Sequence, residues 1–282
     1  MAVRNSCRAF LLRLLALAFF SLLPLALMAQ GGPPLLTDDP ATPGHNNWEV
    51  NVAYTVDRAQ DEHRYEAPII DINYGLGDRI QLKYETPYVL GSHPGEPLRS
   101  GPGNSKFGVK YRFLQNEKLD LNISTYPQLE VNNTKNSVDR DLAEKGPSFL
   151  LPVEVTKKVG KVEMNLEAGH WFTQNKGYWI AGLAGGVHPS KRLEVLAEVY
   201  SDGNSENDNR NNTFDFGGRY RLSRNALIIC MAGRSFSPPS SGQSQFIGYF
   251  GMQFQLGRHL REDEEPEGHA EMPHHAAHEE HR

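Results

Sequence analysis

The feature that most constrains the fold is an alternation of apolar and polar residues with a period of two, which runs through most of the chain after residue 47. The segment 106–113 illustrates it, with the order Lys106, Phe107, Gly108, Val109, Lys110, Tyr111, Arg112, Phe113. Because successive side chains of a strand point to opposite faces, such a segment predicts a strand with one apolar and one polar face. No helical pattern longer than two turns competes with it.

The alternation divides the chain into about twelve segments of this kind. They lie at 48–55, 70–74, 80–85, 106–113, 119–131, 153–159, 162–172, 177–188, 193–201, 214–222, 226–236 and 245–256. Many approach the 9–11 residues with which a tilted strand crosses a bilayer. The apolar faces could meet in the core of a soluble sandwich or face lipid in a membrane barrel, and periodicity alone does not separate the two.

Connection lengths favour the barrel. Tight connections at 75–78, 115–118, 158–161, 189–192 and 223–225 alternate with mostly longer polar ones at 57–64, 91–104, 132–147, 174–176, 202–212 and 237–244. Short turns at one end and long loops at the other are typical of bacterial outer-membrane barrels, and aromatic residues gather near the strand ends as in their girdles. The sequence therefore predicts an all-β fold, a transmembrane up-and-down antiparallel β-barrel of about 12 strands over residues 48–256.

The N-terminus has the layout of a secretory signal peptide. Arg4, Arg8 and Arg13 precede an apolar run from Leu14 to Met28, which closes on Ala29. A single membrane anchor is the competing interpretation, but the run is short, contains a proline and has no stop-transfer charges. We therefore expect a signal peptide at 1–29, a periplasmic lead segment at 30–47 and export to the outer membrane. After Met28 no apolar stretch approaches the 18 residues of a spanning helix.

Charge and cysteine content exclude two further classes. The formal net charge is −5, and no face concentrates Lys and Arg, so we expect no nucleic-acid partner. Cys7 falls within the signal peptide, which leaves Cys230 alone and excludes a disulfide framework.

Two short motifs resemble a known family, the outer-membrane transporter-like proteins labelled "MetA-pathway of phenol degradation". The first is Leu-Thr-Asp-Asp-Pro-Ala-Thr-Pro-Gly at 36–44, which leads into Trp-Glu-Val at 48–50. The second is Gly-Pro-Gly-Asn at 101–104, which leads to Lys-Tyr-Arg-Phe at 110–113 and has Asn104 where the family has Asp. The resemblance implies an outer-membrane barrel with a transport role and supplies no catalytic residues.

Motifs for catalysis are absent from the sequence: it has no nucleophile elbow, phosphate-binding loop or zinc-protease helix. Some outer-membrane barrels are lipid-cleaving enzymes, so His170 is a candidate base, with Ser124 or Ser148 as nucleophile. Nothing in the sequence brings these residues together, and a histidine near a strand end is usually an interface residue. We predict that the protein is not an enzyme.

Two segments could bind metal. The acidic tail at 257–282 is rich in histidine, with His269, His274, His275, His278 and His281 as candidate ligands for a divalent transition metal, and no other cofactor is indicated. A disordered, solvated tail is the alternative, since this composition cannot bury a core. The segment 202–208 has the spaced oxygen ligands of a calcium loop but lacks its glycine and closing glutamate, which favours a plain loop.

The positions opposite in phase to the apolar stripe should line the barrel interior. They are Lys83, Glu85, Lys106, Lys110, Arg112, Glu154, Glu163, Glu167, Glu194, Glu198, Arg219 and Arg221. In a ring of twelve strands, the basic residues between positions 83 and 112 face the acidic residues between positions 154 and 198. These charges either line an open constriction or pair across a narrow interior and seal it.

We expect a barrel for passage or binding of small solutes, among them aromatic or hydrophobic ones. The alternative is a structural or interaction barrel with a closed lumen and a metal-binding tail. Expected partners are outer-membrane lipid, a small-molecule solute and the barrel-assembly machinery, although the hydrophilic tail after Phe254 departs from the usual aromatic end of such barrels.

Overall fold

The computed structural model describes residues 32–174, 177–204, 209–236 and 243–257. Its strands are β1 (Trp48–Ala59), β2 (His63–Leu76), β3 (Ile80–Ser92), β4 (Arg99–Pro102), β5 (Asn104–Asn116), β6 (Leu121–Thr125), β7 (Gln128–Asn132), β8 (Ser148–Val159), β9 (Val162–Phe172), β10 (Tyr178–Ser190), β11 (Leu193–Asn204), β12 (Asn209–Arg221), β13 (Ala226–Ser235) and β14 (Ser244–Leu256). A short helix, α2 (Lys135–Asp139), lies between β7 and β8.

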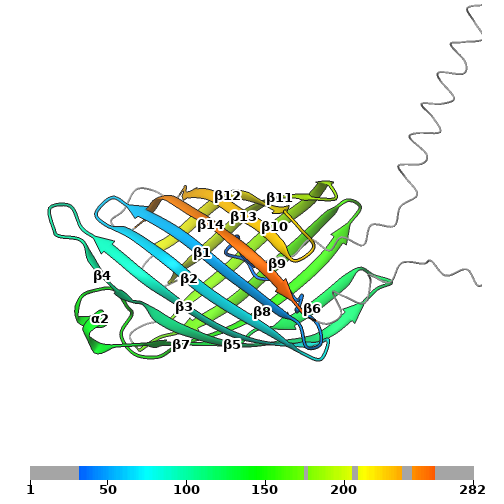
Figure 1. The fold of residues 1–282 in the computed structure, drawn as a ribbon, viewed down its shortest axis with the longest axis horizontal. Helices are drawn as coiled ribbons and strands as arrows, with labels where there is room; N and C mark the ends of the chain where they lie inside the picture. The colour runs from blue at the N-terminus through cyan, green and yellow to red at the C-terminus, as the bar shows by residue number, and fades with distance from the viewer. Residues whose placement is uncertain (1–31, 175–176, 205–208, 237–242, 258–282) are drawn as a thin grey trace, which may run out of the picture.

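These strands form one closed antiparallel β-barrel (Figure 1). Apart from the short segments β4 and β7, successive strands pair with each other, and β1 pairs with β14 from Trp48 opposite Leu256 onward, which closes the sheet. The segments β4 and β5 both pair with β3, and β6 and β7 both lie between β5 and β8, so each of these pairs forms one interrupted strand of the wall. The described barrel therefore has twelve strands in its wall, as the alternation predicted.

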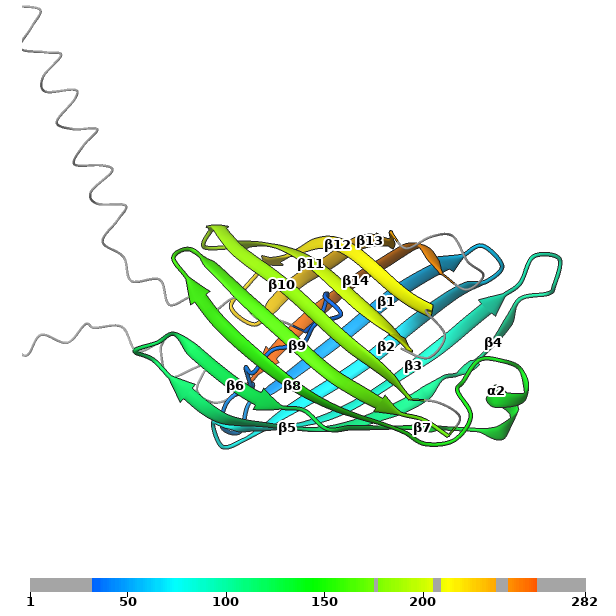
Figure 2. The ribbon, with the colours of Figure 1, turned by 180° about the vertical axis from the view of Figure 1, so that it is seen from behind.

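The two ends of the barrel differ in their connections. The turn end carries the tight connections 77–79, 117–120, 160–161, 191–192 and 222–225, together with the start of β1 and the end of β14. The loop end carries the connections 60–62, 93–98 and 133–147, the last of which contains α2 (Figure 2). Several strands extend further toward the loop end than predicted: β2 begins at His63 and β3 runs to Ser92, because the two strands stay paired as far as His63 opposite Ser92.

The alternation fixes which side of the wall each residue occupies. On β5 the aromatic and aliphatic side chains of Phe107, Val109 and Tyr111 are exposed outside, whereas Lys110 and Arg112 are buried inside. Exposed large apolar side chains recur on most of the long strands, so the barrel has an apolar outer surface and a mainly polar interior. No helix among the described residues is long and apolar enough to cross a membrane.

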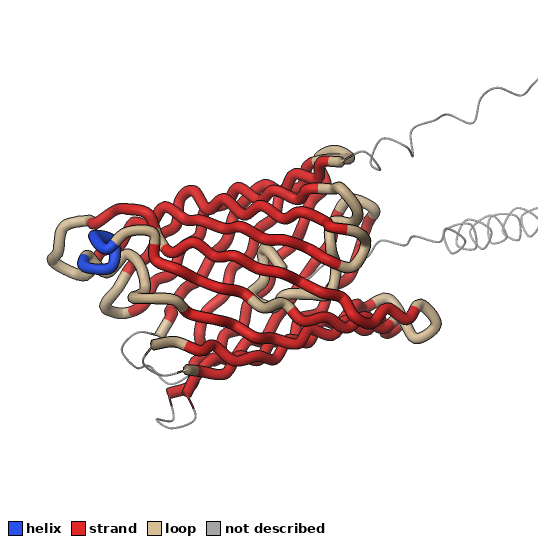
Figure 3. Tube along the Cα trace, turned by 90° about the horizontal axis from the view of Figure 1, so that it is seen from below, coloured by secondary structure: helices blue, strands red, loops and turns tan. Residues whose placement is uncertain are grey.

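The lead segment lies inside the barrel. Figure 3, seen from below, shows a loop within the wall of strands, and Leu35, Thr37 and Asp39 of this segment are at most 6% exposed. The sequence predicted residues 30–47 to precede the barrel on its periplasmic side, so this placement differs from the expectation. The segment has no periodicity that would place it, and its burial depends on contacts with residues far along the chain.

Candidate functional site

We call residues 32–43 the plug segment and the interior residues that hold it the plug site. The plug segment folds back on itself: the N–H of Gly32 donates to the carbonyl of Thr37, and the N–H of Leu35 donates to the carbonyl of Gly32. Gly32 has φ +71°, a left-handed conformation that glycine adopts without strain. The resulting loop directs backbone N–H groups to one wall and the Asp38 carboxylate to the opposite wall.

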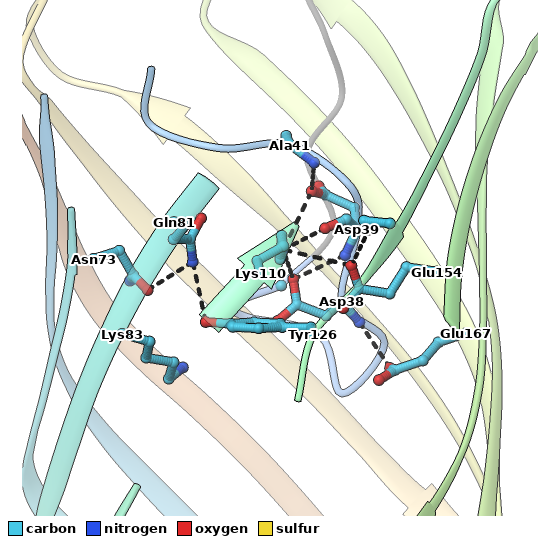
Figure 4. Close-up of polar contacts among 12 residues, drawn as sticks. Asp38, Asp39, Ala41, Asn73, Gln81, Lys83, Lys110, Tyr126, Glu154 and Glu167 are labelled. Carbon is cyan, nitrogen blue, oxygen red and sulfur yellow. Dashed lines mark hydrogen bonds and ion pairs between the residues drawn. The ribbon is translucent and has the colours of Figure 1, made fainter. Parts of the chain in front are cut away.

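We call the side of the barrel that carries Lys83, Lys106, Lys110 and Arg112 on β3 and β5 the basic wall. It holds the plug segment through Lys110 of β5 (Figure 4). Its ammonium lies 2.7 Å from Oδ1 of Asp38 and also donates to the carbonyl of Asp39. The same ammonium lies 3.8 Å from Oε2 of Glu154 and 4.5 Å from the centre of the Tyr126 ring. Lys110 is 2% exposed, so these contacts replace the water that the charge would otherwise hold.

We call the opposite side, which carries Glu154, Glu167 and Glu198 on β8, β9 and β11, the acidic wall. It holds the backbone of the plug segment. The Glu198 carboxylate accepts the N–H groups of Leu36 at 2.8 Å and Thr37 at 2.6 Å, and Glu167 accepts the N–H of Asp38 at 3.0 Å. Hydrogen bonds to an ionised carboxylate are about twice as strong as those between neutral groups. The acidic wall is thus neutralised in part by N–H dipoles of the plug segment.

Arg219 of β12 holds the beginning of the plug segment. Its guanidinium donates to the carbonyl of Pro33 at 2.8 Å and to that of Gly32 at 3.1 Å, while Nη1 lies 3.0 Å from Oε2 of Glu194. At the turn end, Arg112 and Thr42 both donate to the carbonyl of Asp78.

Apolar contacts complete the plug site. Leu35 packs in a buried cluster with Ala184 of β10 and Leu196 of β11. Gly182 of β10 lies against Thr37: a Cβ added at Gly182 would lie only 2.0 Å from Oγ1 of Thr37. Because Thr37 is fully buried, a larger residue at 182 would displace the plug segment.

A ladder of alternating charges continues along the basic wall toward the loop end. Lys83 lies 3.2 Å from Asp71 and 2.7 Å from Glu85, and Lys106 lies 3.3 Å from the other oxygen of Glu85. Neighbouring charges on this wall therefore neutralise one another.

The structure places all the interior residues named from the sequence on the inner side of the wall. Most are at most 9% exposed, while Glu85, Lys106 and Arg221 are partly exposed inside or near the barrel ends. The two walls do not pair directly over most of their extent, because the plug segment lies between them. Glu163 and Glu194 face the interior closer to the turn end, and Arg221 donates to the carbonyl of Arg224 there.

Sequence reasoning missed several interior residues. Asp71 of β2 and Asp215 of β12 are buried at 2% and 0% exposure, and both occupy polar positions between apolar neighbours, so the alternation could have identified them. Gly182 and the plug segment had no such signal, apart from the Thr-Asp-Asp motif that carries the family resemblance.

The structure does not bring the candidate catalytic residues together. His170 contacts Phe172 and Trp179, with ring centroids 4.5 and 4.6 Å apart, on the outer face of the wall. Ser124 is buried inside and donates to Glu154 at 2.5 Å, and Ser148 begins β8 opposite Glu130.

The metal candidates lie elsewhere. His269, His274, His275, His278 and His281 lie outside the described residues, as do residues 205–208 of the candidate calcium loop. Among the described residues, one group of three could offer metal ligands: Glu62, His93 and Asp141 at the loop end. Asp141 is exposed there, and His93 links it to the carbonyl of Asp61, so the group acts as a connection between loops.

Comparison with known proteins supports the architecture. No family model matches the chain, and no curated protein matches it either. Solved structures do: the COG4313 outer membrane channel from Pseudomonas putida F1 matches with TM-score 0.62 and 13% identity, over 80% of this chain and 100% of that chain.

Two porins are similar at lower scores. The KdgM porin in complex with disordered oligogalacturonate matches with TM-score 0.52 and 10% identity, over 73% of this chain and 98% of that chain. The NanC porin matches with TM-score 0.50 and 7% identity, over 74% of this chain and 100% of that chain. At these identities the likeness establishes the fold, a closed barrel of the kind that outer-membrane channels and porins have. The narrower family label indicated by the sequence motifs is not confirmed by these comparisons.

Proposed function

We propose that this protein is an outer-membrane channel for small solutes, in which the plug segment controls passage through the lumen. The observation that carries the proposal is that residues 32–43 are bound between the two charged walls by Lys110, Glu167 and Glu198. These contacts are noncovalent and act on a loop without regular structure, so the segment can leave the site while the barrel wall stays paired. The apolar outer surface supports location in the outer membrane, where alternate residues face lipid.

We further propose that the solutes include aromatic or hydrophobic ones. In support, the interior contains apolar side chains beside the charged ones: Leu150, Ile180 and Met231 are all buried on its inner side. A lumen for sugars or ions alone would not need them, because aqueous barrel interiors are polar.

Gly182 gives the sharpest test of passage. Gly182→Ala places a methyl group where Thr37 lies and should displace the plug segment without changing any charge. The matched control is Gly185→Ala on the same strand, whose Cβ would meet only Val162, at 3.9 Å. In planar bilayers we expect Gly182→Ala to conduct more than the wild type, and Gly185→Ala to behave as the wild type.

The outcomes separate the channel from the alternative barrel. The channel proposal is wrong if the folded Gly182→Ala protein conducts no more than the wild type and neither of the two proteins passes ions or solutes. A closed structural or interaction barrel would then remain. Fractionation with the outer membrane and a heat-dependent shift in gel migration test the location, whereas recovery as a detergent-free soluble monomer would contradict it.

A further inference from the structure

A large cavity lies between the plug segment and the loop end of the barrel. Its volume is about 650 Å³, within the range of cavities that hold small organic ligands. Leu36 of the plug segment borders the cavity and is 45% exposed, although the neighbouring Leu35 and Thr37 are buried. An apolar side chain of the plug segment thus faces open space inside the barrel.

Three aromatic residues border one side of this cavity. Trp171 of β9 and Tyr178 of β10 are register partners whose rings stack with centroids 6.3 Å apart, and Tyr200 of β11 is also part of the lining. Ile180 and Leu150 are buried beside them. Trp and Tyr rings have a negative face that attracts cations as well as apolar groups.

The cavity also carries an excess of negative charge. Among the described residues, its lining has seven carboxylates and three cationic side chains. The carboxylates are Asp38, Asp57, Glu66, Asp71, Glu85, Glu167 and Asp202, and the cations are Arg64, Lys83 and Lys106. Each of the three cations already forms an ion pair on the opposite wall, with Glu66, Asp71 or Glu85, and Asp38 pairs with Lys110, which lies outside the lining.

The carboxylates near the aromatic side accept hydrogen bonds from neutral donors. Asp202 accepts from the Asn211 amide at 3.3 Å, and Glu167 accepts from the backbone N–H of Asp38 at 3.0 Å. Asp202 lies two residues from Tyr200 on the same face of β11 and opposite Ile180. Negative charge and aromatic faces therefore meet on one side of the cavity.

We propose that this cavity is a binding site for organic ammonium ions, with an amine near Asp202 and an apolar body against Trp171, Tyr178 and Leu36. The proposal rests on the channel function and names a class of solute for it. Anions are disfavoured by the carboxylate excess.

A bare metal ion does not suit this arrangement. Glu167 is the register partner of Gly182, whereas Asp202 is the partner of Ile180, so the two carboxylates lie on strands separated by β10. Neighbouring strands are about 4.8 Å apart, which puts these backbones about 10 Å apart. Calcium needs six to eight oxygens within about 2.6 Å, whereas an organic cation can contact both regions at once.

The fluorescence of Trp171 reports occupation of this cavity. The chain has three tryptophans, and Trp48 and Trp179 are exposed on the outer face, so Trp48→Phe with Trp179→Phe leaves Trp171 as the reporter. The full-length double variant in detergent is titrated with benzyltrimethylammonium, benzyl alcohol and benzoate, at constant ionic strength. We expect a saturable fluorescence change with the cation, weaker binding of the alcohol and no saturable change with benzoate.

Further substitutions in the Trp48→Phe, Trp179→Phe double variant test whether the Asp202 carboxylate and the Tyr200 ring contact the bound cation. Asp202→Asn should raise the Kd of the cation about tenfold, whereas Asp139→Asn, in α2 at the same end but outside the cavity lining, should leave it unchanged. Tyr200→Leu should weaken binding, and Tyr200→Phe, which keeps the ring, should restore most of it. Heat-dependent gel migration checks that each variant is folded.

The results overturn or support the site independently of conduction. Equal binding of cation, alcohol and benzoate, absence of saturable binding, or an unchanged Kd in folded Asp202→Asn would each overturn the site. Selective binding of the cation by a barrel that never conducts would support the binding site and refute the channel function. Conduction without cation binding would support the channel function and refute the binding site.

Discussion

Lys110 and Asp38 form a buried ion pair of 2.7 Å between the barrel wall and the segment that precedes the first strand. The pair joins two parts of the chain separated by 72 positions, and the lysine is almost fully excluded from solvent. A buried ion pair contributes little to net stability, but removal of one partner leaves the other charge buried and unpaired. The position of the plug segment therefore depends strongly on this pair.

Lys110→Met should release the plug segment. Without the ammonium, Asp38 and Glu154 lose their cation, which costs about 3–5 kcal/mol while the segment stays in place. In planar bilayers we expect longer or more frequent openings. Asp38→Asn should have a smaller effect, because the amide oxygen still accepts a hydrogen bond from Lys110.

The double variant Lys110→Met with Asp38→Asn completes a thermodynamic cycle. If the two residues act through their contact, the double variant opens less than the sum of the single effects predicts. Additive effects, with all variants folded, would contradict the role of this pair.

The sequence allowed the wall to be predicted in some detail, because strand geometry is local. A period of two assigns each residue of β5 to one side, so the inward position of Lys110 follows from its apolar neighbours Val109 and Tyr111. The same logic put Glu167 and Glu198 inside and made the acidic and basic sets face each other in a ring of twelve.

The plug segment could not be predicted in the same way. Its residues 32–43 have no alternation, and its N–H groups bind Glu198 more than 160 positions away. Gly182 is one of several glycines on β10, and its closeness to Thr37 exists only once the segment has entered the barrel. Both features depend on tertiary contacts, which a local pattern does not contain.

Glu167→Gln with Glu198→Gln should shift ion selectivity toward anions. Both carboxylates are buried on the inner wall, and their removal leaves the opposite basic residues in excess. The measurement is the reversal potential in a salt gradient, made in the Gly182→Ala background so that the lumen conducts. Glu117→Gln, in the exposed connection 117–120, serves as the control, and an unchanged reversal potential in the double variant would refute the charged constriction.

Deletion of residues 258–282 should leave the barrel folded, because β14 already pairs with β1 up to Leu256 opposite Trp48. We propose that the histidines of this tail bind a divalent transition metal, with affinity that falls below about pH 6 as the imidazoles protonate. Titration calorimetry with zinc or nickel, on the full chain and the deletion variant, measures this. Loss of assembly on deletion, together with undetectable metal binding by the full chain, would make the tail an assembly element instead.

His93 should make the loop end sensitive to pH. Its Nδ1 lies 2.8 Å from the carbonyl of Asp61, and its Nε2 lies 3.5 Å from Oδ2 of Asp141, so the ring connects three loops. The hydrogen bond to the Asp61 carbonyl, helped by the Asp141 carboxylate, raises the pKa of His93 above its usual value, against the opposing effects of partial burial and Arg99. Because the folded pKa is raised, the charged contact with Asp141 is fully present below about pH 6.5, the ordinary value, and is lost as pH rises through the folded pKa, whereas the neutral ring can still donate to the Asp61 carbonyl.

Hydrogen exchange of the loops around Asp61 and Asp141 measures this effect. We expect faster exchange at alkaline pH than at pH 6, after correction for the intrinsic rate, and no such difference in His93→Gln. The variant keeps a donor for the Asp61 carbonyl but cannot gain charge, so it isolates protonation from hydrogen bonding. The wall strand β10, distant in sequence from these loops, provides the internal control. Equal corrected protection of the loops at both pH values in the wild type would show that His93 protonation does not hold them together.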